Sequence, residues 1–208
     1  FLNGAGDRHF ARNKIINSDD SFENYSDPLI PFILDLPLET GPNINVLEVG
    51  CGQALRLKKL NENKGWNVHG VDPSEKAVNF AQESGLNCKV STADKLPYED
   101  KKFDLLIYGF CLYLCDREDL FKIAAEADRV LKNQGWIAIF DFWLPSHNEN
   151  NYRHLEGIKS YKMDLPKMFS WHPYYVVFDH SLRHHNNDKH TDNSKEWVAA
   201  TLIRKKNM

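Results

Sequence analysis

The chain has 208 residues and a formal net charge of −3, and hydrophobic residues make up 42% of it. This length and composition suit one ordinary globular domain with a full core. The weakly acidic balance gives no electrostatic case for nucleic-acid binding. No apolar run approaches the ~20 residues that a membrane-spanning helix needs.

The four cysteines lie at positions 51, 88, 111 and 115, without the Cys-x-x-Cys spacing of a zinc site. We expect them to be reduced thiols rather than disulfide partners or metal ligands. No secretory signal is recognised at the start of the chain. The sequence therefore predicts a cytoplasmic protein.

Residues 1–40 predict an N-terminal arm followed by a helix. The first 25 residues are polar and irregular. Asp27 and Pro28 then provide a helix N-cap and a first-turn proline. The apolar residues of the segment 29–36 predict a short helix after them.

Residues 41–142 alternate between strand and helix patterns. The predicted elements are strand 45–49, helix 54–63, strand 67–71, helix 75–84, strand 87–91, strand 103–108, helix 117–131 and strand 135–142. Alternation of this kind implies a parallel sheet with right-handed crossovers and helices on both faces.

Residues 143–172 break the alternation. They are rich in Asn, His, Tyr and Met and contain two prolines, and we expect an inserted cap over the carboxyl ends of the strands. Residues 173–208 predict a C-terminal hairpin with strands 174–179 and 196–204, joined by a polar run. The predicted fold class is α/β: one domain with a Rossmann-like sheet of seven strands, mostly parallel with an antiparallel last strand.

The most informative segment is the end of the strand 45–49 and the turn after it. The strand runs into Glu48 and then into Gly50, Cys51 and Gly52. Glycines permit a sharp turn and let a ligand approach the backbone closely. The next helix starts here, so its free N–H groups face the same place, where open α/β sheets bind nucleotide-like ligands. A carboxylate at this point disfavours a pyrophosphate and favours a ligand that carries an amine.

Asp72 ends the second strand about 20 residues after the turn, where doubly wound folds place the acceptor for ribose hydroxyls. The third glycine of the dinucleotide fingerprint is missing. A ribose acceptor beside an acidic turn with two glycines favours a nucleoside whose charged tail has no phosphate. S-adenosylmethionine fits that description.

At this point the sequence resembles the class I S-adenosylmethionine-dependent methyltransferases, in particular their type 11 members. Five blocks in family order carry the resemblance: Val46–Gly52, Gly70–Ser74, Ser91–Tyr98, Phe103–Ile107 and Leu131–Trp136. Together they span about residues 40–142, and their order and spacing make the resemblance specific.

The resemblance implies that the loops after the first four strands hold the cofactor. The implied contact residues are Glu48, Gly50, Cys51, Gly52, Asp72, Pro73, Ala93, Asp94, Tyr108 and Gly109. Asp72 would accept both ribose hydroxyls, Asp94 would receive the adenine amino group, and Glu48 would lie near the amino group of the methionine part. Two alternatives stay open: Glu48 as a helix cap, and Tyr108 as a core aromatic.

Three residues are candidates for catalysis. Methyl transfer from a sulfonium needs alignment and, for a hydroxyl acceptor, removal of a proton. Many relatives carry a histidine where this chain has Tyr113, which either orients substrate or packs. Asp141 ends the fifth strand and His172 precedes the sixth. We favour His172 as the base, because an imidazole accepts a proton near neutral pH.

The segment Gly6–Asn13 weakly resembles small methyltransferases of bacterial surface-sugar biosynthesis, including pseudaminic-acid pathways. In such enzymes the N-terminal arm often folds over the cofactor, and Arg12 would meet the cofactor carboxylate or an anionic substrate group. His184, His185 and His190 lie in a polar loop, and we expect no metal site there.

We therefore expect methyl transfer to a small molecule, at an oxygen or less often a nitrogen of a sugar-like metabolite. A lipid or quinone methyltransferase is the rival enzyme, although it would need an apolar tunnel and the segment 143–172 is polar. A non-catalytic binding module that keeps the fold is the rival from another class. The expected partner is the small acceptor, without nucleic acid or membrane insertion, and the sequence leaves a homodimer open.

Overall fold

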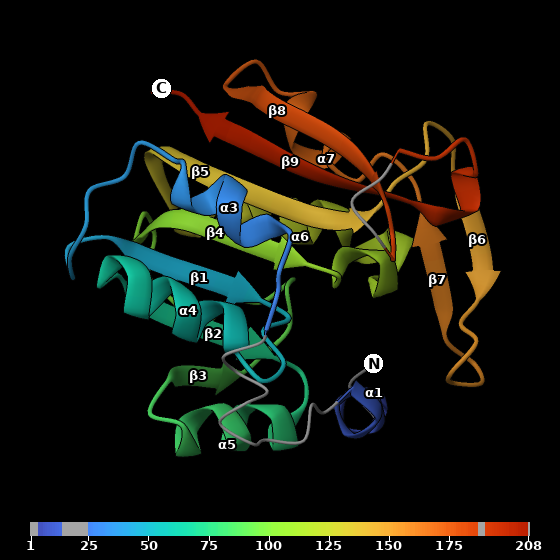
Figure 1. Ribbon diagram of the computed structural model, residues 1–208, viewed down its shortest axis with the longest axis horizontal. Coiled ribbons are helices and arrows are strands. Elements are labelled where there is room, and N and C mark those ends of the chain that lie inside the picture. Colours follow the sequence, from blue (N-terminus) through green and yellow to red (C-terminus); the bar gives the residue numbers. More distant parts are fainter. Residues whose placement is uncertain (1–3, 14–24, 187–189, 208) are drawn as a thin grey trace.

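The computed structural model describes residues 4–13, 25–186 and 190–207. Its centre is a seven-stranded sheet in the order β3-β2-β1-β4-β5-β9-β8 (Figure 1). The strands are β1 (Asn45–Val49), β2 (Asn67–Asp72), β3 (Asn87–Val90), β4 (Phe103–Gly109), β5 (Leu131–Phe142), β8 (Tyr175–His184) and β9 (Trp197–Lys205). Strand β9 is antiparallel to both of its neighbours, and the other pairs are parallel. The predicted α/β class and strand directions are confirmed.

Helices cover both faces of this sheet. One face carries α3 (Leu29–Leu34), α4 (Leu55–Lys64) and α5 (Glu75–Glu83), and the other carries α6 (Leu120–Val130) and α7 (Lys167–Ser170). Helix α6 shows why: Ile123, Ala127 and Val130 recur at helical spacing and are its buried residues. Helix α1 (Ala5–Asn13), near the start of the chain, lies beside α5.

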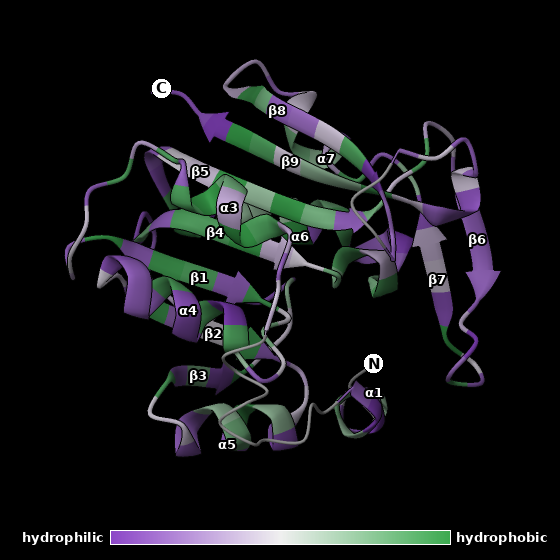
Figure 2. Ribbon diagram, viewed as in Figure 1, coloured by the Kyte–Doolittle hydropathy of each residue, from purple (hydrophilic) through white to green (hydrophobic). Residues whose placement is uncertain are grey.

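The sheet interior is apolar along whole strands rather than on alternate residues. Figure 2 shows the hydrophobic colour concentrated on β1, β4, β5 and β9. In β4, every side chain from Leu105 to Tyr108 is fully buried, as expected for a strand covered on both faces. The core therefore holds the carboxyl ends of the parallel strands in fixed positions, and the loops that follow them meet at one edge.

The segment 143–172 does not form a single cap. Strands β6 (Asn148–Asn151) and β7 (Lys159–Lys162) form a hydrophilic hairpin at the carboxyl edge of the parallel strands (Figures 1 and 2). The chain then runs back along the other face, where α7 packs against α6 and β8. The return is required because β8 runs in the same direction as β5 and must begin at the amino edge. Only the first part of the expected cap lies near the carboxyl edge.

Candidate functional site

A cleft of about 480 Å³ lies at the carboxyl edge of the parallel strands. Its walls come from the loops after β1 to β4, from α1 and from the turn between β6 and β7. Of the residues predicted to bind cofactor, those that line it are Gly50, Gly52, Asp72, Pro73, Ala93, Asp94 and Gly109. The structure thus brings together residues from four separate loops.

Asp72 connects the glycine turn to the end of β2. One carboxylate oxygen accepts a hydrogen bond from the Gly52 N–H at 2.9 Å, and the other accepts from the Ser74 N–H at 2.8 Å. Burial raises the pKa of Asp72 although both donors oppose the shift. Each carboxylate oxygen has roughly two acceptor positions, so the side chain keeps capacity for hydroxyl groups in the cleft that it lines.

The two glycines of the turn serve different purposes. At Gly50, which has φ of +75°, a Cβ atom would lie 2.5 Å from the Cys111 side chain, so the turn needs glycine to sit against its own protein. At Gly52, which has φ of +52°, a Cβ atom would meet nothing within 4 Å. The absent Gly52 side chain leaves the cleft open at the backbone.

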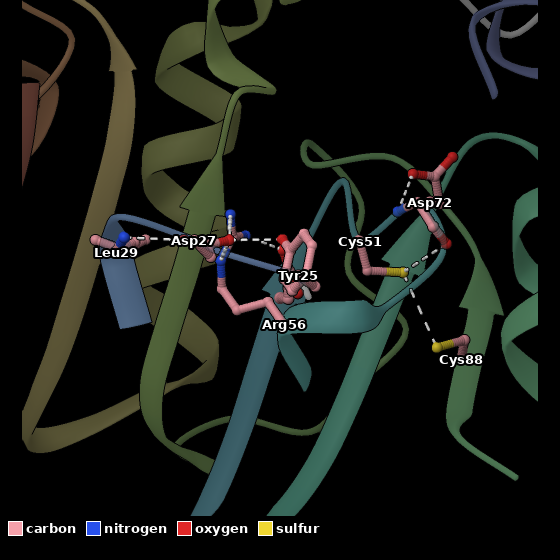
Figure 3. A network of polar contacts seen from close by, with 9 residues as sticks. Tyr25, Asp27, Leu29, Cys51, Arg56, Asp72 and Cys88 are labelled. Carbon is pink, nitrogen blue, oxygen red and sulfur yellow. Dashed lines mark hydrogen bonds and ion pairs between the residues drawn. The ribbon is translucent and has the colours of Figure 1, made fainter. Parts of the chain in front are cut away.

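The N–H groups of the glycine turn have partners within the protein. Those of Gly50 and Cys51 donate to the Val71 carbonyl at 2.8 and 3.1 Å, and that of Gly52 donates to Asp72. The Cys51 thiol faces Cys88 at 3.9 Å, behind the turn (Figure 3). The turn is therefore fastened to β2, and these three N–H groups already have acceptors within the protein.

A buried ion network lies beneath the glycine turn. Arg56, in the first turn of α4, donates to Asp27 from Nε at 2.8 Å and pairs with it through Nη2 at 2.7 Å, while Nη1 pairs with Glu48 (Figure 3 shows the Asp27 side). Tyr25 donates its hydroxyl to Asp27 at 2.7 Å. A side chain at Gly109 would collide with the guanidinium, so that glycine makes room for the network.

Two buried carboxylates share the one guanidinium, and their pKa values move apart. Burial opposes ionisation of Asp27, yet Arg56 and the Tyr25 hydroxyl hold the pKa of Asp27 below its usual value. Burial raises the pKa of Glu48 to about 7, against the attraction of Arg56. The second Glu48 oxygen has no hydrogen-bond partner among the described residues. Glu48 is one of the residues that line a hollow of about 180 Å³, together with Gly50 and Arg56.

Asp141 is not at the mouth of the cleft, where the sequence placed it. Its side chain is buried and accepts hydrogen bonds from the N–H groups of Phe142 at 2.8 Å and Tyr113 at 3.2 Å. The backbone at Cys111 and Leu112 also donates to it. Burial raises the pKa of Asp141 to about 7. The carboxylate fixes the short 3₁₀ helix η1 (Leu112–Leu114) and does not line the cleft.

His172 lies at the wrong edge of the sheet to act as the base. Tyr175, three residues later, pairs with Lys205, next to the pair of Trp136 with Arg204 at the start of the buried part of β5. This is the amino edge, whereas the cleft is at the carboxyl edge. The sequence pattern located the strand but not the edge at which it begins.

The other three predicted residues lie behind the cleft wall. Tyr108 is fully buried with its ring against Phe169, on the face covered by α6 and α7. Tyr113 is also buried, and its ring packs against Phe142. Arg12 is exposed and donates to the Tyr152 hydroxyl at 2.8 Å.

The resemblance implied an N-terminal arm over the cofactor and named Arg12, but sequence reasoning missed the other residues of α1 that line the cleft and the hairpin turn. His9 and Phe10 of α1 line the cleft, as do Ile158 and Lys159. The signal in the sequence was the four-residue spacing of Gly6 and Phe10, which are both buried in a helix too short for a periodic pattern to stand out. The sequence analysis did not predict a role for Arg56, because a basic residue in a helix is usually exposed to solvent.

Comparison with known proteins gives an independent result. Residues 47–139 match the family model described as methyltransferase domain. The chain is 31% identical over 120 residues to 27-O-demethylrifamycin SV methyltransferase of Amycolatopsis mediterranei, covering 52% of this chain and 42% of that enzyme. It spans about half the length, or less, of the first curated relatives that it matches.

Solved structures share the fold. A SAM-dependent methyltransferase from Methanosarcina mazei superposes with a TM-score of 0.68 at 16% identity, over 86% of this chain and 98% of that one. The geranyl diphosphate C-methyltransferase of Streptomyces coelicolor, solved with S-adenosyl-L-homocysteine, gives 0.65 at 12% identity, over 86% and 79%.

Two further findings concern only the described residues. No group of three or more His, Cys, Asp or Glu side chains among them is arranged to hold a metal ion. No helix in the same ranges is long and apolar enough to cross a membrane.

Proposed function

We propose that the chain is a class I S-adenosylmethionine-dependent methyltransferase that methylates a hydroxyl group of a small, sugar-like acceptor, and its match to the methyltransferase domain model over residues 47–139 supports the proposal. The observation that carries the proposal is the arrangement of Asp72 and the glycine turn, which line the cleft at the carboxyl edge and together suit a nucleoside cofactor. This is the position at which an open α/β sheet binds a nucleoside.

Three features of this chain fit the cofactor. Asp72 keeps acceptor capacity for ribose hydroxyls. The open space at Gly52 lets a ligand approach the backbone. The unpartnered oxygen of Glu48 is buried, and an ammonium group beside it would restore the pairing that a buried carboxylate requires. Ala93 and Asp94 line the same cleft, and we assign the adenine to them.

When bound, the cofactor supplies an electrophilic methyl group on its sulfonium. The tasks left to the protein are to align the acceptor and to receive a proton. His9 lies on the cleft wall, and burial, Arg12 and His154 lower its pKa to about 4. Its imidazole is therefore neutral near pH 7 and able to accept a hydrogen bond. A pKa of about 4 makes this imidazole a weak proton acceptor, so we assign to His9 the orientation of the acceptor hydroxyl through a hydrogen bond.

The wall on the acceptor side supports a hydroxylated small molecule. Asn13, Asp116 and Asp119 line it together with the apolar Phe10 and Ile158, a mixture that suits a ring with hydroxyl groups. The Amycolatopsis relative is named for methylation at an oxygen of a small molecule, which supports the same choice. A terpenoid or other lipid acceptor is the second candidate, and an amine acceptor is the third.

The cellular setting and the assembly belong to the same proposal. All four cysteines are free thiols, which supports a reducing, cytoplasmic environment. A homodimer remains a hypothesis, and light scattering of the purified chain tests it.

Calorimetry with S-adenosyl-L-homocysteine and with NAD tests the cofactor. We expect micromolar binding of the former, about −8 kcal/mol, and weaker binding of NAD. Tighter binding of NAD would overturn the proposal. Transfer of labelled methyl from S-adenosylmethionine to matched sugar, amine and isoprenoid panels then tests the acceptor. Binding without turnover on any panel would favour the non-catalytic module.

A further inference from the structure

Side chains from three distant parts of the sequence meet behind the cleft wall, at Tyr152 of the loop after β6. The Tyr152 hydroxyl accepts a hydrogen bond from Arg12 Nη2 at 2.8 Å, and the Arg12 guanidinium carbon lies 5.5 Å from the centre of the tyrosine ring. His9, one turn earlier in α1, has its ring centre 6.2 Å from that of Tyr152. Tyr152 therefore contacts two successive turns of α1.

Tyr152 is itself held by the protein on its other sides. Tyr113 of η1 shares a side-chain hydrogen bond with it, and the two ring centres are 6.2 Å apart. The His154 ring packs edge-on against Tyr152 at 5.4 Å. Because the backbone of Tyr113 is fixed by Asp141, Tyr152 is joined to the rigid end of β5 through one intermediate residue.

Helix α1 depends on such contacts for its position. It has nine residues, and a helix of that length is marginal by itself in water. It rests on α5: Asp7 accepts a hydrogen bond from the hydroxyl of Ser74, the N-cap of α5, at 2.6 Å, and Phe10 contacts Phe80 within α5. Near the carboxyl end of α1, Arg12 contacts Tyr152.

We propose that Tyr152 is a positioning residue that fastens α1 to the hairpin loop and so keeps His9 and Phe10 on the cleft wall, where they enclose the cofactor. The inference rests on the proposed function, because it assigns the cleft to S-adenosylmethionine. Tyr152 does not line the cleft itself, so it acts through α1. Without the attachment, α1 still contacts α5 but its carboxyl-terminal turn separates from the hairpin, and a bound ligand escapes more easily.

Two variants divide the attachment into its parts. Tyr152→Phe keeps the ring against His9 and removes the hydroxyl that accepts from Arg12. Tyr152→Ala removes both. We expect dissociation of S-adenosyl-L-homocysteine to be about threefold faster in Tyr152→Phe and about tenfold faster in Tyr152→Ala. Arg12→Ala removes the same bond to the Tyr152 hydroxyl and leaves that of Tyr113, so the double variant should be clearly less affected than the sum of the two single variants. The exposed Tyr174 at the amino edge gives the control, Tyr174→Ala, which should change nothing.

The decisive measurement pairs stopped-flow dissociation of S-adenosyl-L-homocysteine with amide hydrogen exchange of residues 5–13 in the ligand-free protein. Support requires that Tyr152→Ala speeds both dissociation and exchange in α1 while exchange in the sheet is unchanged. Unchanged exchange in α1, or faster exchange with unchanged dissociation, overturns the inference. If the wild-type chain does not bind S-adenosyl-L-homocysteine, the proposed function fails, and the exchange data still decide whether Tyr152 holds α1.

Discussion

Glu48 and Asp141 occupy equivalent positions at the ends of β1 and β5, yet their carboxylates have different hydrogen-bond partners. Both side chains are buried, and burial raises the pKa of each to about 7. Glu48 pairs with the Arg56 side chain and keeps one oxygen without a partner among the described residues. Asp141 is surrounded by backbone N–H groups of the loop after β4. A carboxylate at a strand end is available to a ligand only when backbone N–H groups leave acceptor positions on its oxygens free, as they do at Asp72.

This difference separates the two halves of the carboxyl edge. At the ends of β1 and β2 the acids retain acceptor capacity next to open space, and that half is where the cofactor is proposed to bind. At the end of β5, Asp141 accepts hydrogen bonds from the backbone and so fixes η1. We therefore expect this half to shape the cleft and not to supply a base. The predictions below test that separation, starting with the largest expected effect.

Arg56→Ala should destabilise the fold by about 3–5 kcal/mol, because it leaves two buried carboxylates without their shared cation. Urea unfolding of the ligand-free chain measures the loss. Lys167→Ala is the matched control: it removes an ion pair with Asp164 whose lysine side chain is 71% exposed, and such pairs contribute only about 0–1 kcal/mol. Equal effects of the two substitutions would show that the Arg56 network is not what holds Glu48.

Asp141→Asn should destabilise the fold by about 1–3 kcal/mol, since one oxygen that accepts from backbone N–H groups becomes a donor. It should also flatten the pH dependence of stability. A carboxyl whose folded pKa is raised from 3.8 to about 7 makes the folded state bind protons more tightly. Stability then falls as pH rises between about 4 and 7. Unfolding measured at several pH values should show a shallower fall in Asp141→Asn than in the wild type, and an unchanged slope would contradict the raised pKa.

Asp72→Asn should weaken binding of S-adenosyl-L-homocysteine by about tenfold, or 1.4 kcal/mol, through loss of a charged acceptor for the ribose. The substitution should also act on the stability of the ligand-free protein. The bonds from Gly52 and Ser74 lead us to expect a small loss as well, about 1 kcal/mol. Calorimetry and urea unfolding separate the two effects, and a stability loss with unchanged affinity would make Asp72 purely structural.

His172→Ala should have the smallest effect, because the residue lies at the amino edge, away from the cleft. Turnover, once an acceptor is found, and affinity for S-adenosyl-L-homocysteine should both stay within about twofold of the wild type, below 0.5 kcal/mol. His9→Ala is the paired variant and should lower turnover by about tenfold, because it removes a hydrogen bond that orients the acceptor on the cleft wall. If His172→Ala lost turnover and His9→Ala kept it, the assignment of the reaction to the cleft at the carboxyl edge would be wrong.

The amino-acid sequence by itself determined the alternating core, the glycine turn after β1 and the place of Asp72. These features follow from local rules. Periodicity indicates which residues are buried, and glycine permits a positive φ. The position of an acid at the end of a strand is fixed by that strand. The bounds of β1 are those predicted, and those of β2 and α4 differ from prediction by one residue. Local rules are sufficient for parallel strands, because their carboxyl ends must meet at one edge.

Only the tertiary structure decided what each candidate side chain contacts. His172 was assigned to the cleft because the sequence does not tell at which edge β8 begins, and that depends on the pairing of β5, β9 and β8. Asp141 and Glu48 look alike in sequence, and they differ because a loop folds over one and Arg56 reaches the other. The contacts of His9 and Tyr152 join residues more than 140 positions apart. Such contacts are long-range, so the free energy that selects them comes from packing of the whole chain and leaves no periodic signal in any one segment.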